Sequence, residues 1–171
     1  MTGTLPGPTV AFVLQTAPIF TIPRPRIGFV GAVSRYKVDF ELIAAVSRAR
    51  PAWHWVMIGS EGEGQPGARV GRTLNLPNVH LLGRRDYTAL PDYLRGLDVA
   101  TLPCPHNDYT RSMFPMKFFE YLAAGCPVVS TELHALAEFA HVHIRAEGPD
   151  AWIAAIATAL AGGGPSLDQR L

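Results

Sequence analysis

The stretch FPMKFFEYLAAGCPVVST, residues 114–131, decides the fold of this chain. It contains, in order, the patterns of a loop, a short helix and a buried strand. Pro115 suits the first position of a helix, where its missing N–H group is not needed. Gly125 ends the helix because glycine tolerates a left-handed backbone, and Pro127 cannot continue it. The apolar run that starts at Val128 predicts a strand.

A single carboxylate lies in the helix expected within this stretch. Met116, Phe119 and Ala123 recur at helical spacing and predict an apolar face. Glu120 lies near the helix start, where exposed N–H groups attract anions such as phosphate. A carboxylate there can accept hydrogen bonds from the two vicinal hydroxyls of a ribose, so the pattern suggests a nucleotide site. Taken alone, Glu120 is more simply a solvated charge paired with Lys117, three residues earlier.

Short apolar runs alternate with helical patterns on both sides of this stretch. Continuous apolar runs are typical of strands covered on both faces, and strict alternation predicts a parallel, doubly wound sheet. The expected fold class is therefore α/β, a single Rossmann-like domain. The expected strands lie at residues 27–31, 53–58, 79–82, 99–102, from 128 and 142–144, and the expected helices at 39–50, 69–74, 89–94, from about 132 and at 150–160.

The bulk composition predicts one globular domain. The chain has 171 residues, of which 48% are hydrophobic and 17% charged. The formal net charge of +1 gives no support for nucleic-acid binding by bulk electrostatics. We expect an irregular segment at residues 1–25, the folded domain at 26–162 and a frayed tail at 163–171. The apolar patch at 9–20 lacks a basic region before it and is too short to span a bilayer, so a cytoplasmic protein is expected.

Neither the cysteines nor the histidines predict a redox or metal site. Cys104 and Cys126 are too few for a disulfide framework and are expected to be small buried apolar side chains. His141 and His143 would share one face of a strand, but two ligands do not make a zinc site. No Asp-x-Asp pair suggests a divalent metal, so we expect no metal and no other cofactor.

Ligands of doubly wound sheets bind beyond the carboxyl ends of the strands, where the strand order reverses. The first loop there, residues 31–37, begins with Gly31, which permits a tight turn near a ligand. Arg35 and Lys37 can supply positive charge to a phosphate, although most such side chains are ordinary surface charges. The glycine-rich loop at 59–64 matches no phosphate-binding fingerprint, and a surface loop is the better interpretation.

A pair of arginines follows the strand expected at 79–82. Arg84 and Arg85 come directly after Gly83 and could stack on a base or hold a phosphate. A solvated pair of surface charges is an equally good interpretation.

Four segments, in the right order and spacing, make the chain similar to the C-terminal, nucleotide-sugar-binding half of GT-B glycosyltransferases of the group-one type. The most specific is residues 114–131, with its glutamate, helix and Ala-x-Gly-x-Pro-Val-Val. The others are residues 31–43, 77–83 and 93–100. The resemblance covers about residues 27–160.

The resemblance implies a role for each candidate residue. Glu120 would hold the ribose of the donor nucleotide, and Lys37, the catalytic candidate, would neutralise the donor diphosphate. Such enzymes are metal-independent and transfer the sugar with retention. The remaining candidates are Gly31 and Arg84 for the nucleotide, and Ser112, Met113, Phe114, Pro115 and Arg35 for the phosphates and the donor sugar.

Two positions depart from the family pattern. Ser112 stands where the family often has a second glutamate, and Ala32 where an arginine usually follows the first glycine; Arg35 is a candidate substitute. The implied partners are a nucleotide sugar and an N-terminal acceptor-binding domain, in the same protein or a separate chain, with peripheral membrane association left open and no nucleic acid. A non-catalytic nucleotide-sugar-binding or partner subunit and an epimerase fragment of the same fold are the alternatives.

Overall fold

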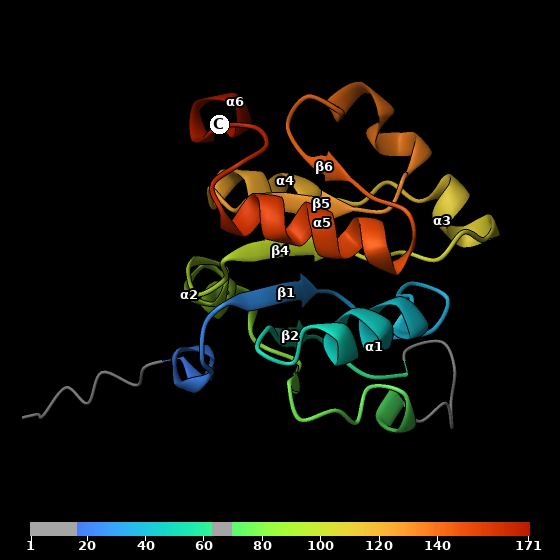
Figure 1. Ribbon diagram of the computed structural model, residues 1–171, viewed down its shortest axis with the longest axis vertical. Helices are drawn as coiled ribbons and strands as arrows, with labels where there is room; N and C mark the ends of the chain where they lie inside the picture. The colour runs from blue at the N-terminus through green and yellow to red at the C-terminus, as the bar shows by residue number, and fades with distance from the viewer. Residues whose placement is uncertain (1–16, 63–69) are drawn as a thin grey trace, which may run out of the picture.

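The computed structural model describes residues 17–62 and 70–171, and within them one parallel sheet has six strands in the order β3-β2-β1-β4-β5-β6 (Figure 1). The expected α/β, doubly wound fold is confirmed. The strands are β1 (Arg26–Val30), β2 (His54–Ile58), β3 (Val79–Gly83), β4 (Val99–Leu102), β5 (Val128–Ser130) and β6 (Ile144–Arg145). The order reverses between β1 and β4, where Ile27 pairs with both Trp55 and Val99.

Helices cover both faces of the sheet. In Figure 1, α1 and α5 lie in front of it, while α2 and α4 lie behind. The helices are α1 (Phe40–Ala49), α2 (Leu90–Arg95), α3 (Asp108–Ser112), α4 (Lys117–Ala123), α5 (Gly148–Leu160) and α6 (Leu167–Arg170), with 3-10 turns η1 (Pro18–Thr21), η2 (Val70–Arg72), η3 (Tyr87–Ala89) and η4 (His134–Phe139). None of the described helices has the length and apolar character of a membrane-spanning segment.

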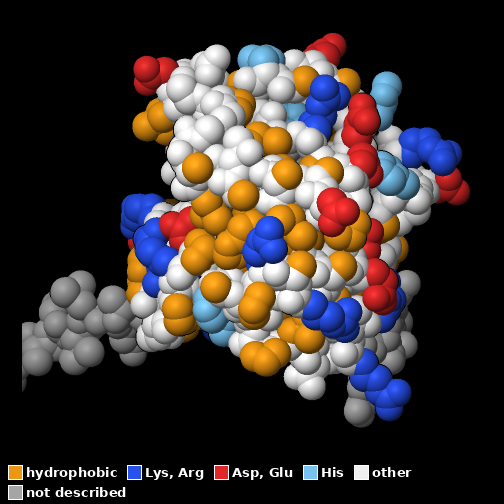
Figure 2. Space-filling view, in the orientation of Figure 1, with side chains coloured by type: hydrophobic (Ala, Val, Ile, Leu, Met, Phe, Trp, Pro, Cys, Tyr) orange, Lys and Arg blue, Asp and Glu red, His pale blue; other side chains and the backbone are white. Residues whose placement is uncertain are grey.

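Two apolar cores follow from this layering. One joins the sheet to α1 and α5 and contains Trp55 and Trp152, both fully buried. The other joins it to α2, α4 and η4 and contains Phe118 and Tyr121. Figure 2 shows apolar side chains gathered over α5 and α1 in the middle of the visible face, where α5 presents exposed alanines.

Local sequence signals explain where α1 begins. Asp39, the first residue of the helix expected at 39–50, caps α1, because its carboxylate accepts a hydrogen bond from the backbone N–H of Leu42 at 3.0 Å. Residues 27–30 form a buried strand as the apolar run predicted, and the observed strand begins one residue earlier, at the buried Arg26.

The buried face of α4 differs from the predicted one. The helix begins at Lys117, two residues after Pro115, whose carbonyl accepts a hydrogen bond from Phe118 at 2.9 Å. The side chains packed inward are those of Phe118, Tyr121 and Leu122. Of the predicted apolar face, Met116 is 66% exposed and lines a hollow that Lys37 also lines, Ala123 lines a hollow beside α2, and only Phe119 packs against the core.

The two ends of the chain also differ from expectation. Ile19 and Ile22, in the segment expected to be irregular, are buried in the core behind the sheet. At the other end, where a frayed tail was expected, α6 lies against the turn after α4, with Arg170 donating to the carbonyl of Gly125 at 3.1 Å. Residues 1–16 and 63–69 lie outside the described residues. The second range includes the end of the glycine-rich loop and the first residue of the short helix expected at 69–74.

The prediction that His141 and His143 share one face of a strand is wrong. Both residues precede β6, which has only two residues, and His141 is exposed while His143 is buried. The backbone reaches the sheet only at Ile144, which pairs with Val129.

Candidate functional site

Two loops meet where the strand order reverses, the expected position of a ligand site in this kind of sheet. One follows β1 and the other follows β4. They are joined by a hydrogen bond from the N–H of Asp39 to the carbonyl of Pro103 at 2.8 Å, and by one from the Asn107 side chain to the carbonyl of Tyr36 at 2.9 Å.

Two hollows open at the carboxyl end of β1, and a third lies beside them between α2 and α4. The arginine hollow is lined by Val30, Gly31, Ala32, Ile58, Gly59, Ser60, Arg84, Arg85 and Leu90. The lysine hollow is lined by residues 29–32 and 113–117 together with Lys37, Leu102, Cys104 and Tyr109. The glutamate hollow is lined by Tyr87, Leu90, Pro91, Leu94, Arg95, Glu120, Ala123 and Ala124. Residues 30–32 border the first two hollows, and Leu90 borders the first and third.

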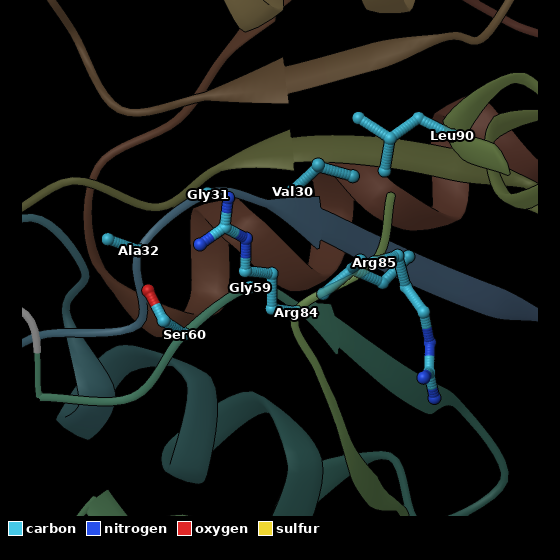
Figure 3. A pocket seen from close by; sticks show the side chains of 9 residues that line it. Val30, Gly31, Ala32, Gly59, Ser60, Arg84, Arg85 and Leu90 are labelled. Carbon is cyan, nitrogen blue, oxygen red and sulfur yellow. The ribbon is translucent and has the colours of Figure 1, made fainter. Parts of the chain in front are cut away.

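The arginine hollow depends on a close approach of two glycines. A Cβ atom on Gly59 would lie 1.8 Å from the carbonyl oxygen of Gly31, so only glycine fits there. In Figure 3 the guanidinium of Arg84 extends toward Gly31, whereas Arg85 points away from it. The guanidinium carbon of Arg85 lies 5.7 Å from the centre of the Tyr93 ring. Arg84 is therefore the arginine that reaches across this hollow.

In the lysine hollow, Lys37 lies beside two aromatic rings. Its Nζ atom is 5.3 Å from the ring centre of Tyr36 and 5.7 Å from that of Tyr109. The two rings meet edge to face with centres 5.0 Å apart, and Tyr109 belongs to α3. Cation–π contacts of this kind favour one position of a flexible lysine, here at the mouth of the sheet.

In the glutamate hollow, Glu120 is ion-paired with Lys117. The Nζ atom of Lys117 donates to Oε2 of Glu120 at 2.7 Å, and the two side chains are 29% and 30% exposed. The same Nζ lies 5.4 Å from the ring centre of Tyr87, which comes from η3. The pairing of Glu120 with Lys117, which was the simpler interpretation of the sequence, therefore exists. It lies at the wall of a hollow and not on open surface.

The residue after Glu120 holds α4 against β1. The fully buried hydroxyl of Tyr121 accepts a hydrogen bond from the N–H of Val30 at 2.8 Å and donates to its carbonyl at 3.4 Å. Burial raises the pKa of this phenol, which keeps it neutral. Because Val30 directly precedes Gly31, this contact fixes Glu120 relative to the loop that follows β1.

The structure brings most of the predicted site residues to these hollows. They are Lys37, Glu120, Gly31, Arg84, Met113, Phe114 and Pro115. Arg35 and Ser112 lie outside the lining of the three hollows. Arg35 donates to the hydroxyl of Thr73 at 2.7 Å and lies 3.5 Å from the carboxylate of Glu41, while Ser112 is exposed at the end of α3.

Sequence reasoning missed three residues of the site. Tyr109 was missed because no helix was expected between residues 102 and 114, although Asn107 and Thr110 form a capping box there. Tyr87 carries no local signal, since its place follows from the packing of η3. Lys117 was noticed only as a partner of Glu120, although it also lines the lysine hollow.

The cysteines are buried and free, as predicted. Burial raises the pKa of Cys104 to about 12 and that of Cys126 to about 11, so both are thiols at neutral pH and poor nucleophiles. Among the described residues, no three His, Cys, Asp or Glu side chains gather so as to hold a metal ion.

Comparison with known proteins identifies related sequences. The family model for glycosyl transferases group 1 matches residues 24–162. TuaH of Bacillus subtilis (strain 168), which carries the name of a teichuronic acid biosynthesis glycosyltransferase, is 30% identical over 133 residues, covering 75% of this chain and 33% of TuaH. The chain thus spans about a third of the length of this curated relative.

Solved structures share the fold. Sucrose-phosphate synthase from Thermosynechococcus elongatus superposes with a TM-score of 0.68 at 22% identity, over 83% of this chain and 38% of that one. HepE from Anabaena, solved with UDP, superposes with a TM-score of 0.66 at 17% identity, over 81% of this chain and 39% of HepE. The C-terminal domain of LpcC, a glycosyl transferase group 1 family protein from Francisella tularensis, gives 0.61 at 18% identity, over 88% and 81%.

Proposed function

Because this chain belongs to the glycosyl transferases group 1 family, we propose that it is the donor-binding half of an enzyme that moves a sugar from a nucleoside diphosphate to a glycan or lipid-linked acceptor. The observation that carries the proposal is the Glu120 carboxylate at the wall of a hollow, ion-paired with Lys117, which also lines the lysine hollow together with Lys37. A carboxylate next to cations suits a ligand that presents both hydroxyls and phosphates.

Glu120 and Lys37 have different roles in this proposal. Glu120 accepts hydrogen bonds from the two ribose hydroxyls, because a carboxylate offers about four lone-pair sites and the bond with Lys117 occupies one of them. Lys37 faces the diphosphate from the lysine hollow. The chain at residues 113–115 borders the same hollow and would meet the phosphates and the donor sugar.

The arginine hollow provides space for the base. Gly31 and Gly59 leave the floor of this hollow without side chains, and the guanidinium of Arg84 extends over it (Figure 3). A guanidinium plane can stack on a base or donate hydrogen bonds to its edge.

The reaction we propose retains the configuration of the sugar and needs no metal or other cofactor. The bond between the sugar and the diphosphate breaks, the oxygen of an acceptor hydroxyl bonds to the same face of the sugar, and the hydroxyl proton passes to the departing diphosphate. Positive charge from Lys37 would stabilise the departing diphosphate, the electrostatic contribution that is generally the largest in such reactions.

Relatives suggest the substrate class and the pathway. HepE of Anabaena has been solved with UDP and with UDP-glucose, which supports a nucleoside diphosphate sugar as the donor here. The name of TuaH supports a role in polysaccharide biosynthesis. The acceptor half would be an N-terminal domain or a separate chain, since LpcC superposes as a C-terminal domain.

One observation favours the second candidate, a non-catalytic donor-binding or partner subunit. Arg35, the candidate substitute for the arginine that Ala32 replaces, is engaged with Thr73 and Glu41 and does not line the hollows. If Lys37 is the only cation that serves the diphosphate, binding survives but transfer is slow. Addition of an acceptor-binding domain and a nucleotide sugar distinguishes the two, because only the enzyme then releases the nucleoside diphosphate.

Calorimetric titration with UDP and GDP tests the donor site. Glu120→Ala should weaken binding by about 2–4 kcal/mol, because two hydrogen bonds to a charged group are lost. Glu138→Ala removes an exposed carboxylate on η4 and is the matched control, with unchanged affinity expected. Equal affinity of Glu120→Ala and the unmodified chain would refute the assignment.

A further inference from the structure

Lys117 is the one described residue that lines the lysine hollow and also bonds a side chain of the glutamate hollow. It occupies the first position of α4, and Glu120 follows three residues later, on the same side of the helix. Its ammonium therefore lies between the place proposed for the diphosphate and the place proposed for the ribose.

The environment of Lys117 favours one position of its side chain. Glu120 accepts its hydrogen bond at 2.7 Å, and the ring of Tyr87 faces the same ammonium at 5.4 Å. Both contacts are attractive for a cation, and they approach it from different elements, α4 and η3. Tyr87 is 72% exposed and therefore contributes little to the core. Its ring instead contacts the ammonium of Lys117.

A carboxylate that binds the ribose of a nucleotide also repels the phosphates attached to that ribose, because both carry negative charge. An unpaired negative charge within a few ångströms repels a diphosphate, because partly exposed charges interact appreciably over such distances. An ammonium bonded to the carboxylate cancels most of that repulsion and leaves one carboxylate oxygen fully available to hydroxyl groups.

We propose that Lys117 is the counter-ion of the donor site: it neutralises Glu120 so that the site accepts a nucleoside diphosphate and not only a nucleoside. Lys117 is thus a positioning and specificity-determining residue, distinct from Lys37, which faces the diphosphate itself. This inference rests on the proposed function.

The test compares the affinities of UDP and uridine, and in parallel of GDP and guanosine, by calorimetric titration. Lys117→Met should lower the ratio of diphosphate affinity to nucleoside affinity by about tenfold or more, as expected when about 1.4 kcal/mol of repulsion is restored. Lys117→Arg keeps the charge and should keep the ratio. Arg48→Met removes an exposed cation from the last turn of α1 and should leave the ratio unchanged.

A double variant separates the counter-ion role from a direct contact with phosphate. In the Lys117→Met background, Glu120→Gln removes the unpaired carboxylate charge, so the ratio should rise again although both affinities are weak. If the ratio stays low in the double variant, Lys117 bonds the phosphate itself and the counter-ion role is refuted.

The remaining outcomes tell the inference apart from the function on which it rests. If the unmodified chain binds UDP in a manner that depends on Glu120 while Lys117→Met leaves the ratio unchanged, the inference alone is overturned. If the unmodified chain binds none of the four ligands, the proposed function and the inference are both overturned.

Discussion

At the scale of single residues, the proposed donor site depends on charged side chains that neighbouring side chains hold in place. Lys37 lies beside Tyr36 and Tyr109, and Glu120 is paired with Lys117. Their proposed roles differ in the part of the ligand that they bind, so they should fail in different ways when they are replaced.

Lys37→Ala should weaken UDP binding by about tenfold or more and change uridine binding by less than about twofold, because the lysine acts on phosphate charge. Titration calorimetry with both ligands measures the two effects. Lys37→Arg is the control that retains the charge. An equal loss for UDP and uridine would show that Lys37 supports the fold of the site and does not act on the diphosphate.

His143 should make the protein less stable as the pH falls. Burial lowers the pKa of this imidazole; its Nδ1 donates to the carbonyl of Phe139 at 2.8 Å, and its buried Nε2 has no partner among the described residues. The unfolded chain takes up a proton near pH 6.5 whereas the folded protein resists it, so stability is fully present above that pH and declines below it.

Denaturant unfolding between pH 7.5 and pH 5 measures the slope of the free energy of unfolding against pH. His143→Gln should flatten it, while His141→Gln, which changes an exposed histidine nearby, should not. Burial also lowers the pKa of His80, so part of the slope remains in both variants. Identical slopes in all three proteins would contradict the explanation.

At the scale of elements, the glycines at the ends of β1 and β2 let two loops approach each other. The N–H of Gly31 donates to Ile58 at 2.9 Å, and the N–H of Val33 donates to Ser60 at 2.8 Å. A side chain on Gly59 would occupy the place of the Gly31 carbonyl, with a φ of +152° in addition.

Gly59→Ala should therefore lower the free energy of unfolding by about 3 kcal/mol, the upper part of the range for overpacking. Denaturant unfolding measures the change. Gly71→Ala is the matched control, since nothing lies within 4 Å of a Cβ atom there and a change within about 0.5 kcal/mol is expected. A similarly small effect at Gly59 would mean that the two loops can separate without cost.

The sequence predicted the elements that local signals define. Continuous apolar runs marked β1, β2 and β4, Asp39 marked the start of α1, and Gly125 marked the end of α4, where its φ is +75°. What it did not predict depends on tertiary contacts. α3 has only five residues and is held by Asn107 to the loop after β1, and the buried face of α4 is decided by the core behind the sheet.

The candidate site divides in the same way. The positions of Glu120 and Lys37 followed from the strand–loop–helix order, because such sheets place their loops together. The direction of Arg35 toward Thr73, and the contact between Lys117 and Tyr87, depend on side-chain packing between elements distant in the sequence. No local pattern specifies such contacts.

At the scale of the whole molecule, the chain is one doubly wound unit, with the arginine and lysine hollows at the carboxyl end of β1. It spans 33% of TuaH and 38% of sucrose-phosphate synthase, whereas it covers 81% of the C-terminal domain of LpcC. We therefore propose that transfer takes place between this unit and an acceptor-binding partner, and that donor binding is the activity this unit retains by itself.

A crystal structure of the chain grown with UDP or GDP tests the central claim most directly. The account predicts the ribose hydroxyls within hydrogen-bond distance of the Glu120 carboxylate, with the diphosphate in the lysine hollow facing Lys37 and the base in the arginine hollow. A nucleotide bound elsewhere, or Glu120 turned away from the ribose, would contradict it.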